Sequence, residues 1–339
     1  MLIAFRLIAA SCLGLLAVPV SGQDAYFLEP LRSEPLRSEP LWVENLSPLA
    51  GLVALPSQRS ARITPGLTIA LHGAVANHWV SQDEAEESVF FDGETGRVTA
   101  AFEYGFSDAN SFRLSVPWVS HSQGSLDGLI NDWHALFGMS DGGRSHYPED
   151  NFQYRYRRDE GEALLVQSAS GLGDVRAEWN TALLQADSYA VSASVGYKFS
   201  TGDDPVWLGS GAGDVFTSLR FSGRHLSDLP LVWHGQLGYT YAGQSELLGA
   251  AQRRNLWRAG LSVDWQLGQH WSLLAQIDGH AGVVDSALGA IGNGPSVLLS
   301  LGTRYRLTSS WLVDVSFVED IRVETAPDIT FQATLRWQP

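Results

Sequence analysis

The stretch "GLTIALHGAVANHWV" (residues 66–80) alternates between two kinds of side chain. Large apolar residues fall on the odd positions, and smaller or polar residues fall on most of the even positions. Because successive side chains of a strand point to opposite faces, this pattern is typical of a β-strand with one apolar face. The apolar face holds Leu67, Ile69, Leu71, Val75 and Trp79, and the other holds Thr68, Ala70, His72, Ala74 and His78.

The same alternation returns in "YAVSASVGYKF" (189–199), in "LWRAGLSVDWQ" (256–266) and over residues 311–317. Strands of about ten residues are long enough to cross a bilayer at a tilt. After residue 22, no apolar run approaches the roughly 20 residues of a membrane helix. We therefore expect an all-β chain, a transmembrane antiparallel β-barrel of about 12 strands. The number becomes 14 if "FQYRYR" (152–157) and "ALLVQS" (163–168) also span the membrane.

The connections between the predicted strands alternate in length. Short turns near 107–110, 186–188, 226–230, 267–270 and 308–309 alternate with long connections near 81–96, 121–173, 200–213, 243–254, 282–295 and 321–326. Short periplasmic turns and long external loops are typical of outer-membrane barrels, which also carry two girdles of aromatic residues. We expect one girdle at Phe106, Phe112, Trp265, Trp271, Tyr305, Trp311 and Trp337, and the other at Trp79, Trp118, Tyr197, Tyr241 and Trp257.

The first residues predict export. A short basic start, an apolar run over residues 7–20 and a small residue at Gly22 indicate a signal peptide over residues 1–22. Cys12, the only cysteine, lies within it. Residues 23–41 contain the repeat "EPLRSEPLRSEPL" (29–41) and predict a low-complexity periplasmic tether, either a spacer or a segment that a periplasmic partner recognises. Residues 42–65 are then an N-terminal segment before the barrel, and residues 66–339 form the barrel.

One segment, "GSLDGLINDWHALFGMSDGGR" (124–144), has helical spacing instead. We expect one short helix in a long external loop, folded over the barrel mouth as a lid or constriction. Trp133 and Phe137 belong to its apolar face, which must be buried. Asp127, Asn131 and His134 share its polar side, which is either a stripe that binds a metal or a sugar, or a solvated helix face.

Charged residues recur at positions that the alternation places toward the barrel lumen. One interpretation is structural, because a narrow barrel must pair its interior charges. The other is a polar pathway for an anionic or amphipathic solute. The candidates are Glu103, Arg113, Arg176, Glu178, Lys198, Arg220, Arg258, Asp264, Asp278, Arg304, Arg306 and Asp314, with Arg224 and Arg336 beside them.

Four phrases appear in a familiar order: "NLSPLAGLVALP" (45–56), "FFDGETGRV" (90–98), the helical segment and "GLGD" (171–174). On these the chain resembles the uncharacterised domain-of-unknown-function family 3187, outer-membrane β-barrel proteins of Gram-negative bacteria. The resemblance covers the chain from about residue 41. It implies a fold and the cell outer membrane as the location, and it supplies neither a substrate nor a mechanism.

The expected function is that of a porin-like or transport and binding protein for a small solute. The alternative is a structural or surface-interaction barrel with a plugged lumen, and a third, weaker interpretation is a lipid-modifying enzyme. No G-x-S-x-G motif is present, and we expect no catalytic residue, cofactor or metal. The expected partners are outer-membrane lipid, lipopolysaccharide and the barrel-assembly machinery, while a net charge of −15 argues against nucleic acid.

Overall fold

The computed structural model describes residues 38–124, 126, 128, 151–159, 161–224, 229–291, 294–321, 326–327 and 329–339. The predicted signal peptide, the tether up to residue 37 and almost all of the predicted loop helix lie outside these residues. Three short 3₁₀ turns lie in the described connections: η2 (Ala50–Leu52), η4 (Asp204–Val206) and η5 (Gly249–Ala251). No helix in the described part of the chain is long and apolar enough to cross a membrane.

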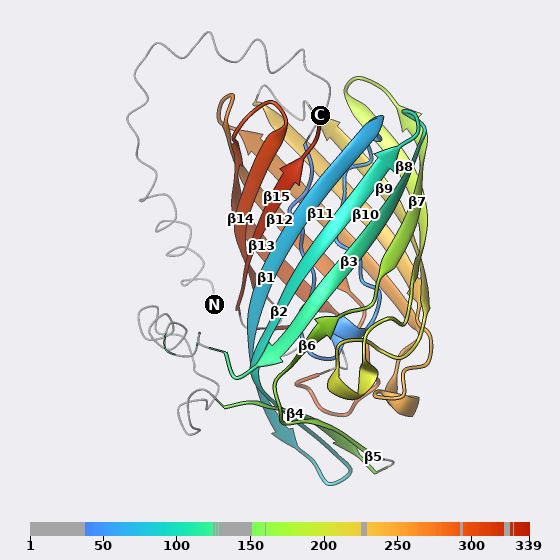
Figure 1. Ribbon diagram of the computed structural model, residues 1–339, viewed down its shortest axis with the longest axis vertical. Helices are drawn as coiled ribbons and strands as arrows, with labels where there is room; N and C mark the ends of the chain where they lie inside the picture. The colour runs from blue at the N-terminus through green and yellow to red at the C-terminus, as the bar shows by residue number, and fades with distance from the viewer. Residues whose placement is uncertain are drawn as a thin grey trace.

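Twelve antiparallel strands form a closed barrel (Figure 1), as the alternation predicted. Each strand pairs with its neighbours in the wall, and β15 returns to β1, where Phe331 lies opposite Val75. A closed wall leaves no strand edge in lipid, so the backbone polar groups of the wall are paired. The strands are β1 (Gly66–Asp83), β2 (Glu87–Gly105), β3 (Asn110–Ser122), β7 (Arg176–Gln185), β8 (Tyr189–Lys198), β9 (Asp214–Arg224), β10 (Leu231–Tyr241), β11 (Asn255–Gln266), β12 (Trp271–His280), β13 (Ser296–Arg306), β14 (Trp311–Asp320) and β15 (Ile329–Trp337).

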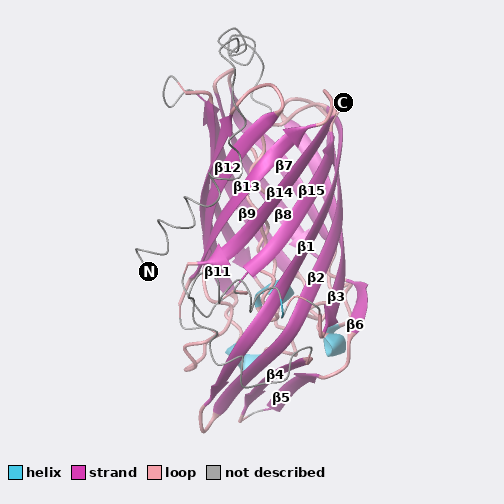
Figure 2. Cartoon of the chain, turned by 90° about the vertical axis from the view of Figure 1, so that its left-hand side faces the viewer, coloured by secondary structure: helices cyan, strands magenta, loops and turns pink. Residues whose placement is uncertain are grey.

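Short strands outside the wall settle the number of spanning strands. β4 (Gln153–Arg158) and β5 (Gly161–Leu165) form a hairpin that pairs with the first residues of β2, beyond the end of the wall (Figure 2). β6 (Ala169–Leu172) pairs with the end of β3. The segments that raised the alternative of 14 strands are therefore external, and the barrel has twelve.

The prediction of a long connection over residues 81–96 is wrong. β1 and β2 continue through this region as paired strands, with only residues 84–86 between them. Val89 and Phe91 are buried here, and Tyr154 of β4 contacts the Phe91 ring. Because this extension of β2 is buried along nearly every residue, it lacks the alternation by which the other strands are recognised.

The two ends of the barrel differ. The short-turn end carries the C-terminus and the turns after β2, β7, β11 and β13, whereas the long-loop end carries the connections after β3, β8, β10, β12 and β14 (Figure 1). Between the ends, the outer surface of the wall is apolar. On β11, Trp257, Leu261 and Trp265 are 49, 63 and 42% exposed, while Arg258 and Asp264 are buried inside. An apolar belt of this kind faces lipid.

The chain before β1 fills the barrel. Residues 38–65, here called the interior segment, enter near the short-turn end, reach η2 near the long loops and return to Gly66 (Figure 1). Leu41, Leu46 and Leu52 are at most 2% exposed although they belong to no strand. Residues 38–41, the end of the predicted tether (23–41), and residues 42–65, the predicted segment before the barrel, both lie inside the lumen, because the wall supplies partners for their apolar and polar groups.

Candidate functional site

The inner wall is lined with charges that largely pair with one another. Arg304 contacts both Asp264 and Asp314, with Nη1 3.0 Å from Asp264 Oδ2. Arg220 pairs with Glu178, which is 5% exposed. Further predicted inward residues also lie inside or at the rim. Glu103 contacts Arg113, Arg258 donates to Thr240 and Ser218, and Asp278 accepts from Gln58 and Gln276. Arg306 is half-buried beside the turn after β13.

The interior segment completes several of these pairs. Glu44 receives Arg97 of β2 on Oε2 at 2.9 Å and Arg176 of β7 on Oε1. Arg59 contacts Glu103 of β2 and lies 3.6 Å from Glu178 of β7. The wall and the interior segment therefore have complementary charges, and removing one partner would leave a buried charge without compensation.

Neutral contacts continue this match. Near the short-turn end, the Ser38 hydroxyl donates to Asp264. Further along, Asn45 Nδ2 lies 3.0 Å from His280 Nε2. The Trp42 ring stacks on His72, with ring centroids 4.8 Å apart and 4° between the planes. Side chains of β1, β11 and β12 thus contact the interior segment at several points along its length.

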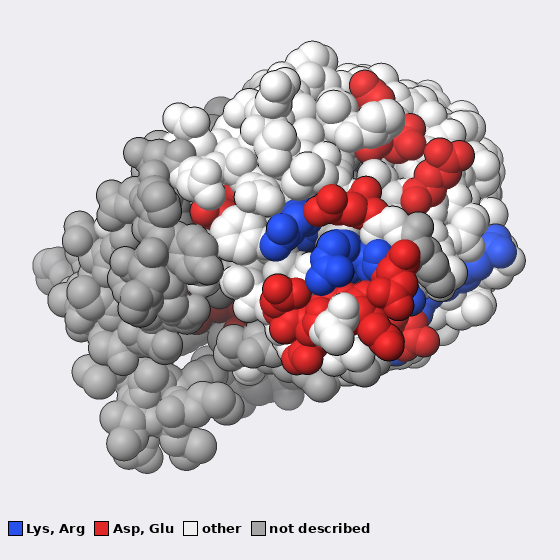
Figure 3. Space-filling model, turned by 90° about the horizontal axis from the view of Figure 1, so that it is seen from below, with Lys and Arg blue, Asp and Glu red and all other residues white. Residues whose placement is uncertain are grey.

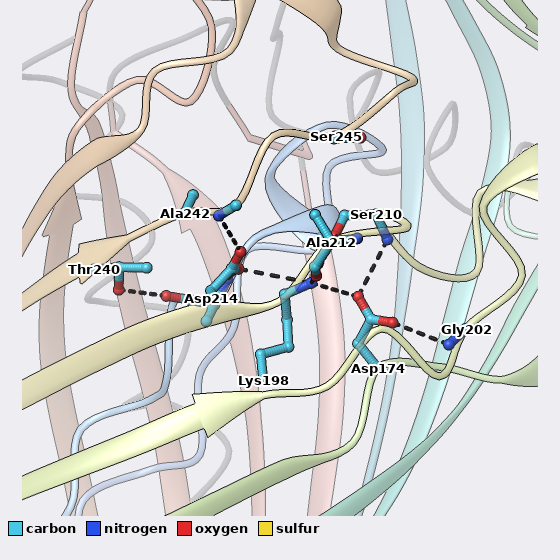
Figure 4. A network of polar contacts seen from close by, with 12 residues as sticks. Asp174, Lys198, Gly202, Ser210, Ala212, Asp214, Thr240, Ala242 and Ser245 are labelled. Atoms are coloured by element: carbon cyan, nitrogen blue, oxygen red, sulfur yellow. Dashed lines mark hydrogen bonds and ion pairs between the residues drawn. The ribbon is translucent and has the colours of Figure 1, made fainter.

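Two glycine-rich motifs of the long loops each end in an aspartate that contacts the same buried lysine (Figure 4). Asp174, which ends "GLGD", and Asp214, which ends "GSGAGD", both face Lys198 Nζ, with Asp214 Oδ2 3.6 Å away. Asp214 Oδ2 also accepts from the Ala54 N–H at 2.8 Å, and its Oδ1 accepts from the Gly243 N–H at 2.9 Å. This cluster links the loops after β8 and β10 to the interior segment.

An apolar cluster lies under the long loops. The Leu49, Leu52 and Val53 side chains at the apex of the interior segment pack into it. Such packing removes these apolar side chains from water. The wall and the loops contribute Val89, Phe91, Tyr154, Tyr156, Leu165, Trp207, Ala242, Leu248, Leu256, Val283, Val284, Leu288 and Ile291, among others.

A network of polar contacts around Thr95 lies inside this apolar end. The Thr95 hydroxyl is 3.0 Å from both His78 Nε2 and His121 Nδ1, and 3.1 Å from the Tyr154 hydroxyl. Burial raises the pKa of Tyr154, so this phenol stays neutral and joins the network as a hydroxyl. The other nitrogen of His121, Nε2, lies 3.0 Å from the Trp207 carbonyl oxygen. The network thereby ties β1, β2, β3 and β4 to the loop after β8.

Cavities lie along the interior segment among the described residues. One near the short-turn end holds about 880 Å³ of empty space, its open mouth included, and is bordered by Arg59, Arg113 and Glu178 among other charged residues. A second, of about 370 Å³ with its mouth included, lies between the segment and β10–β13 and shares Pro56, Ser57 and Gln58 with the first. A third, of about 520 Å³ with its mouth included, lies near the long loops and shares His280 with the second.

The rim of the long-loop end is strongly charged. Seen from that end, basic side chains are flanked by a larger number of acidic ones (Figure 3). Exposed Asp83 pairs with Arg157 of β4 at 3.3 Å, and exposed Asp285 pairs with Arg253 at 2.9 Å. These pairs are accessible to solvent, so they contribute little to stability.

A serine and a histidine come together in a way that the sequence did not reveal. Ser222 Oγ lies 2.8 Å from His234 Nδ1, and His234 Nε2 lies 3.4 Å from Ser38 Oγ. Ser222 is fully buried and accepts the Ala61 N–H of the interior segment at 2.8 Å. Ser222 of β9 and His234 of β10 thus contact the interior segment at Ala61 and Ser38.

Sequence reasoning missed the partners contributed by the interior segment. Glu44 and Arg59 stand outside any alternating strand, and the acids of "GLGD" and "GSGAGD" follow glycines that indicate turns alone. Four charged residues in the 28 positions before the first strand, beside many apolar ones, are the available signal. The loop-helix candidates Asp127, Asn131, Trp133, His134 and Phe137 lie outside the described residues.

A closed twelve-stranded barrel with a lipid-facing apolar belt and a charged, occupied lumen defines the class of outer-membrane β-barrel proteins. The chain belongs to the family described as "Protein of unknown function (DUF3187)", whose model matches residues 27–338. The family resemblance seen in the sequence is thereby confirmed.

The solved structures that are similar to this chain include outer-membrane channels and porins. The COG4313 outer membrane channel from Pseudomonas putida F1 is 15% identical, with a TM-score of 0.50, over 81% of this chain and 95% of that chain. The KdgM porin is 7% identical, with a TM-score of 0.43, over 80% and 99%. A Pseudomonas aeruginosa FadL homologue is 10% identical, with a TM-score of 0.40, over 81% and 90%. Comparison with curated proteins finds no match.

Proposed function

We propose that this protein is an outer-membrane channel for a small solute, and that residues 38–65 are its gate. The observation that carries the proposal is the series of cavities beside the interior segment. Each cavity shares lining residues with the next, from the long-loop end to the short-turn end. A barrel built only as a scaffold has no need for neighbouring cavities along its lumen, because interiors otherwise pack densely.

The contacts of the segment suit a gate. Through most of the lumen it is held by hydrogen bonds and ion pairs, such as those of Glu44 and Arg59. Polar groups of this kind can exchange their partners for water, so undocking costs far less than their gross interaction energy. Apolar packing is most extensive at its apex, around η2, and two smaller apolar clusters hold Leu41, Trp42 and Val43. The fold shared with a protein described as an outer membrane channel agrees with this proposal.

The rival function is a structural or surface-interaction barrel with a permanently plugged lumen. The apolar cluster at the long-loop end favours it, because that cluster separates the lumen from the outside. Planar-bilayer recording of the full protein distinguishes the two. We expect discrete conductance steps, and a folded, heat-modifiable barrel that stays silent over a wide voltage range would exclude the channel.

We also propose that the protein catalyses no covalent reaction. The Ser222–His234 pair is buried against the interior segment, which supports this view. Phospholipid or lipid A turnover by the refolded protein, with calcium present, would contradict it. The barrel-assembly machinery and lipopolysaccharide are the partners that we propose for assembly and for the outer leaflet.

A further inference from the structure

The cavity near the long loops differs in character from the rest of the lumen, and we propose that it is a binding site for a small, neutral, mainly apolar molecule with one hydrogen-bonding group. The inference deepens the proposed function, and its gating half rests on that function. The cavity, here called the outer pocket, lies between the apex of the interior segment, β1, β2 and the loops after β12 and β14.

The lining of the outer pocket selects against charge. Among the described residues that border it, none is Asp, Glu, Lys or Arg. The walls are formed by Pro48, Leu49, Ala50, Val80, Phe91, Val283, Ala290, Ile291 and Pro327, together with Trp79. An ion entering this space would lose its hydration without a compensating charge, which is far more costly than the transfer of a neutral apolar body. Small-molecule sites characteristically combine such walls with a few polar groups.

The floor of the pocket provides those polar groups. His280 Nδ1 lies 2.8 Å from the Ala281 carbonyl oxygen, which can only accept, so Nδ1 carries the proton. His280 Nε2 is then the acceptor for Asn45 Nδ2, at 3.0 Å. Asn45 Nδ2 also lies 3.3 Å from Ser296 Oγ. Of this group, Ser296 and His280 border the pocket, so a hydroxyl on the ligand can bind to the Ser296 hydroxyl or compete for His280, whereas a purely apolar molecule leaves the group unchanged.

The position of the pocket couples it to the gate. One side of it is the interior segment itself, over Ser47–Ala50. Asn45, which borders the second cavity, binds the segment to His280 of β12 and Ser296 of β13, and both of these residues line the outer pocket. A ligand in the pocket therefore touches the apex that the apolar cluster holds, and a ligand hydroxyl that binds Ser296 or His280 competes with their contacts to Asn45. His280 also borders the second cavity.

The test uses the full protein in lipid nanodiscs, with 4-fluorobenzyl alcohol as the neutral probe and 4-fluorobenzoate as its charged analogue, both observed by ¹⁹F NMR. Ala290→Trp fills the pocket, since Ala290 is buried in its wall. Ala287→Trp is the matched control, because Ala287 is exposed in the same loop. Empty nanodiscs correct for partition of the probes into lipid.

We expect saturable binding of the alcohol, at least tenfold weaker binding of benzoate, and at least a tenfold loss of alcohol binding in Ala290→Trp but not in Ala287→Trp. Equal binding by the wild type and Ala290→Trp would overturn the site, as would a preference for benzoate. Bilayer recording separates this inference from the channel itself. If the protein binds the alcohol saturably but shows no conductance, the binding site is supported and the channel function is rejected. If it conducts but its binding does not depend on the pocket, the channel function is supported and the binding site is rejected.

Discussion

Glu44 of the interior segment and Arg97 of β2 form a buried ion pair, with Oε2 and Nη1 2.9 Å apart. The second carboxylate oxygen of Glu44 contacts Arg176 of β7, so each oxygen has its own guanidinium. One residue of the interior segment thereby joins two strands that lie on either side of β3. The arrangement fixes the segment in one position and makes its release measurable.

Glu44→Gln should loosen the docked segment. The change leaves Arg97 and Arg176 buried without a counter-charge, and breaking a buried ion pair from one side costs about 3–5 kcal/mol. The wall is paired from strand to strand, so heat-modifiable migration should be unchanged. We expect a higher open probability in single-channel recordings. Glu246→Gln, at an exposed loop position, is the control, and an open probability equal to that of the control would count against the gate.

Lys198→Met should weaken the contacts that hold the loops after β8 and β10. Asp174 and Asp214 would remain buried with no cation between them, and Asp214 would hold the Ala54 N–H less firmly. The loss should again be about 3–5 kcal/mol, seen as faster protease cleavage within residues 199–213 of the folded protein. Adding Asp174→Asn removes one uncompensated charge and should restore part of the resistance. Unaltered cleavage in Lys198→Met would refute the role of the cluster.

Leu261→Arg should oppose insertion into the membrane. Leu261 lies in the middle of β11 and is 63% exposed on the outer face of the wall. Arginine near the bilayer midplane costs about 2–4 kcal/mol, and near the interface about 0–1 kcal/mol. Leu267→Arg, at 48% exposure in the short turn after β11, should therefore be nearly neutral. The measurement is the free energy of folding into lipid vesicles, and equal costs for the two variants would place the belt elsewhere.

The predicted loop helix can be tested with a double substitution. The Leu126 N–H donates to Glu94 Oε1, so the start of the segment contacts β2 near the long-loop end. If its apolar face covers the barrel mouth, replacing Trp133 and Phe137 together by alanine removes that packing, and a helix this short should not persist alone. We expect faster protease cleavage between residues 138 and 147 on intact cells and a larger conductance. Wild-type values of both would eliminate the lid.

Strand alternation was sufficient to predict the barrel, because a wall with lipid on one side and polar groups on the other imposes a period of two on each strand. It failed at Val89 and Phe91, where β2 is covered on both faces, and the turn between β1 and β2 was therefore misplaced. The same alternation predicted which charged residues of the strands point into the lumen. Their partners Glu44 and Arg59 were not, because a segment threaded through a lumen follows the shape of that lumen and has no period of its own.

The most direct test of the gate is a disulfide between the interior segment and the wall. Ser60 of the segment and Ser222 of β9 have their Oγ atoms 3.5 Å apart, so Ser60→Cys with Ser222→Cys requires little movement. Cys12, in the predicted signal peptide, is the only native cysteine. Single-channel recording of the double variant should show openings at least tenfold rarer when oxidised than after reduction of the same protein. Equal conductance in the oxidised and reduced protein would show that solute passes without movement of the segment, and would contradict the gate.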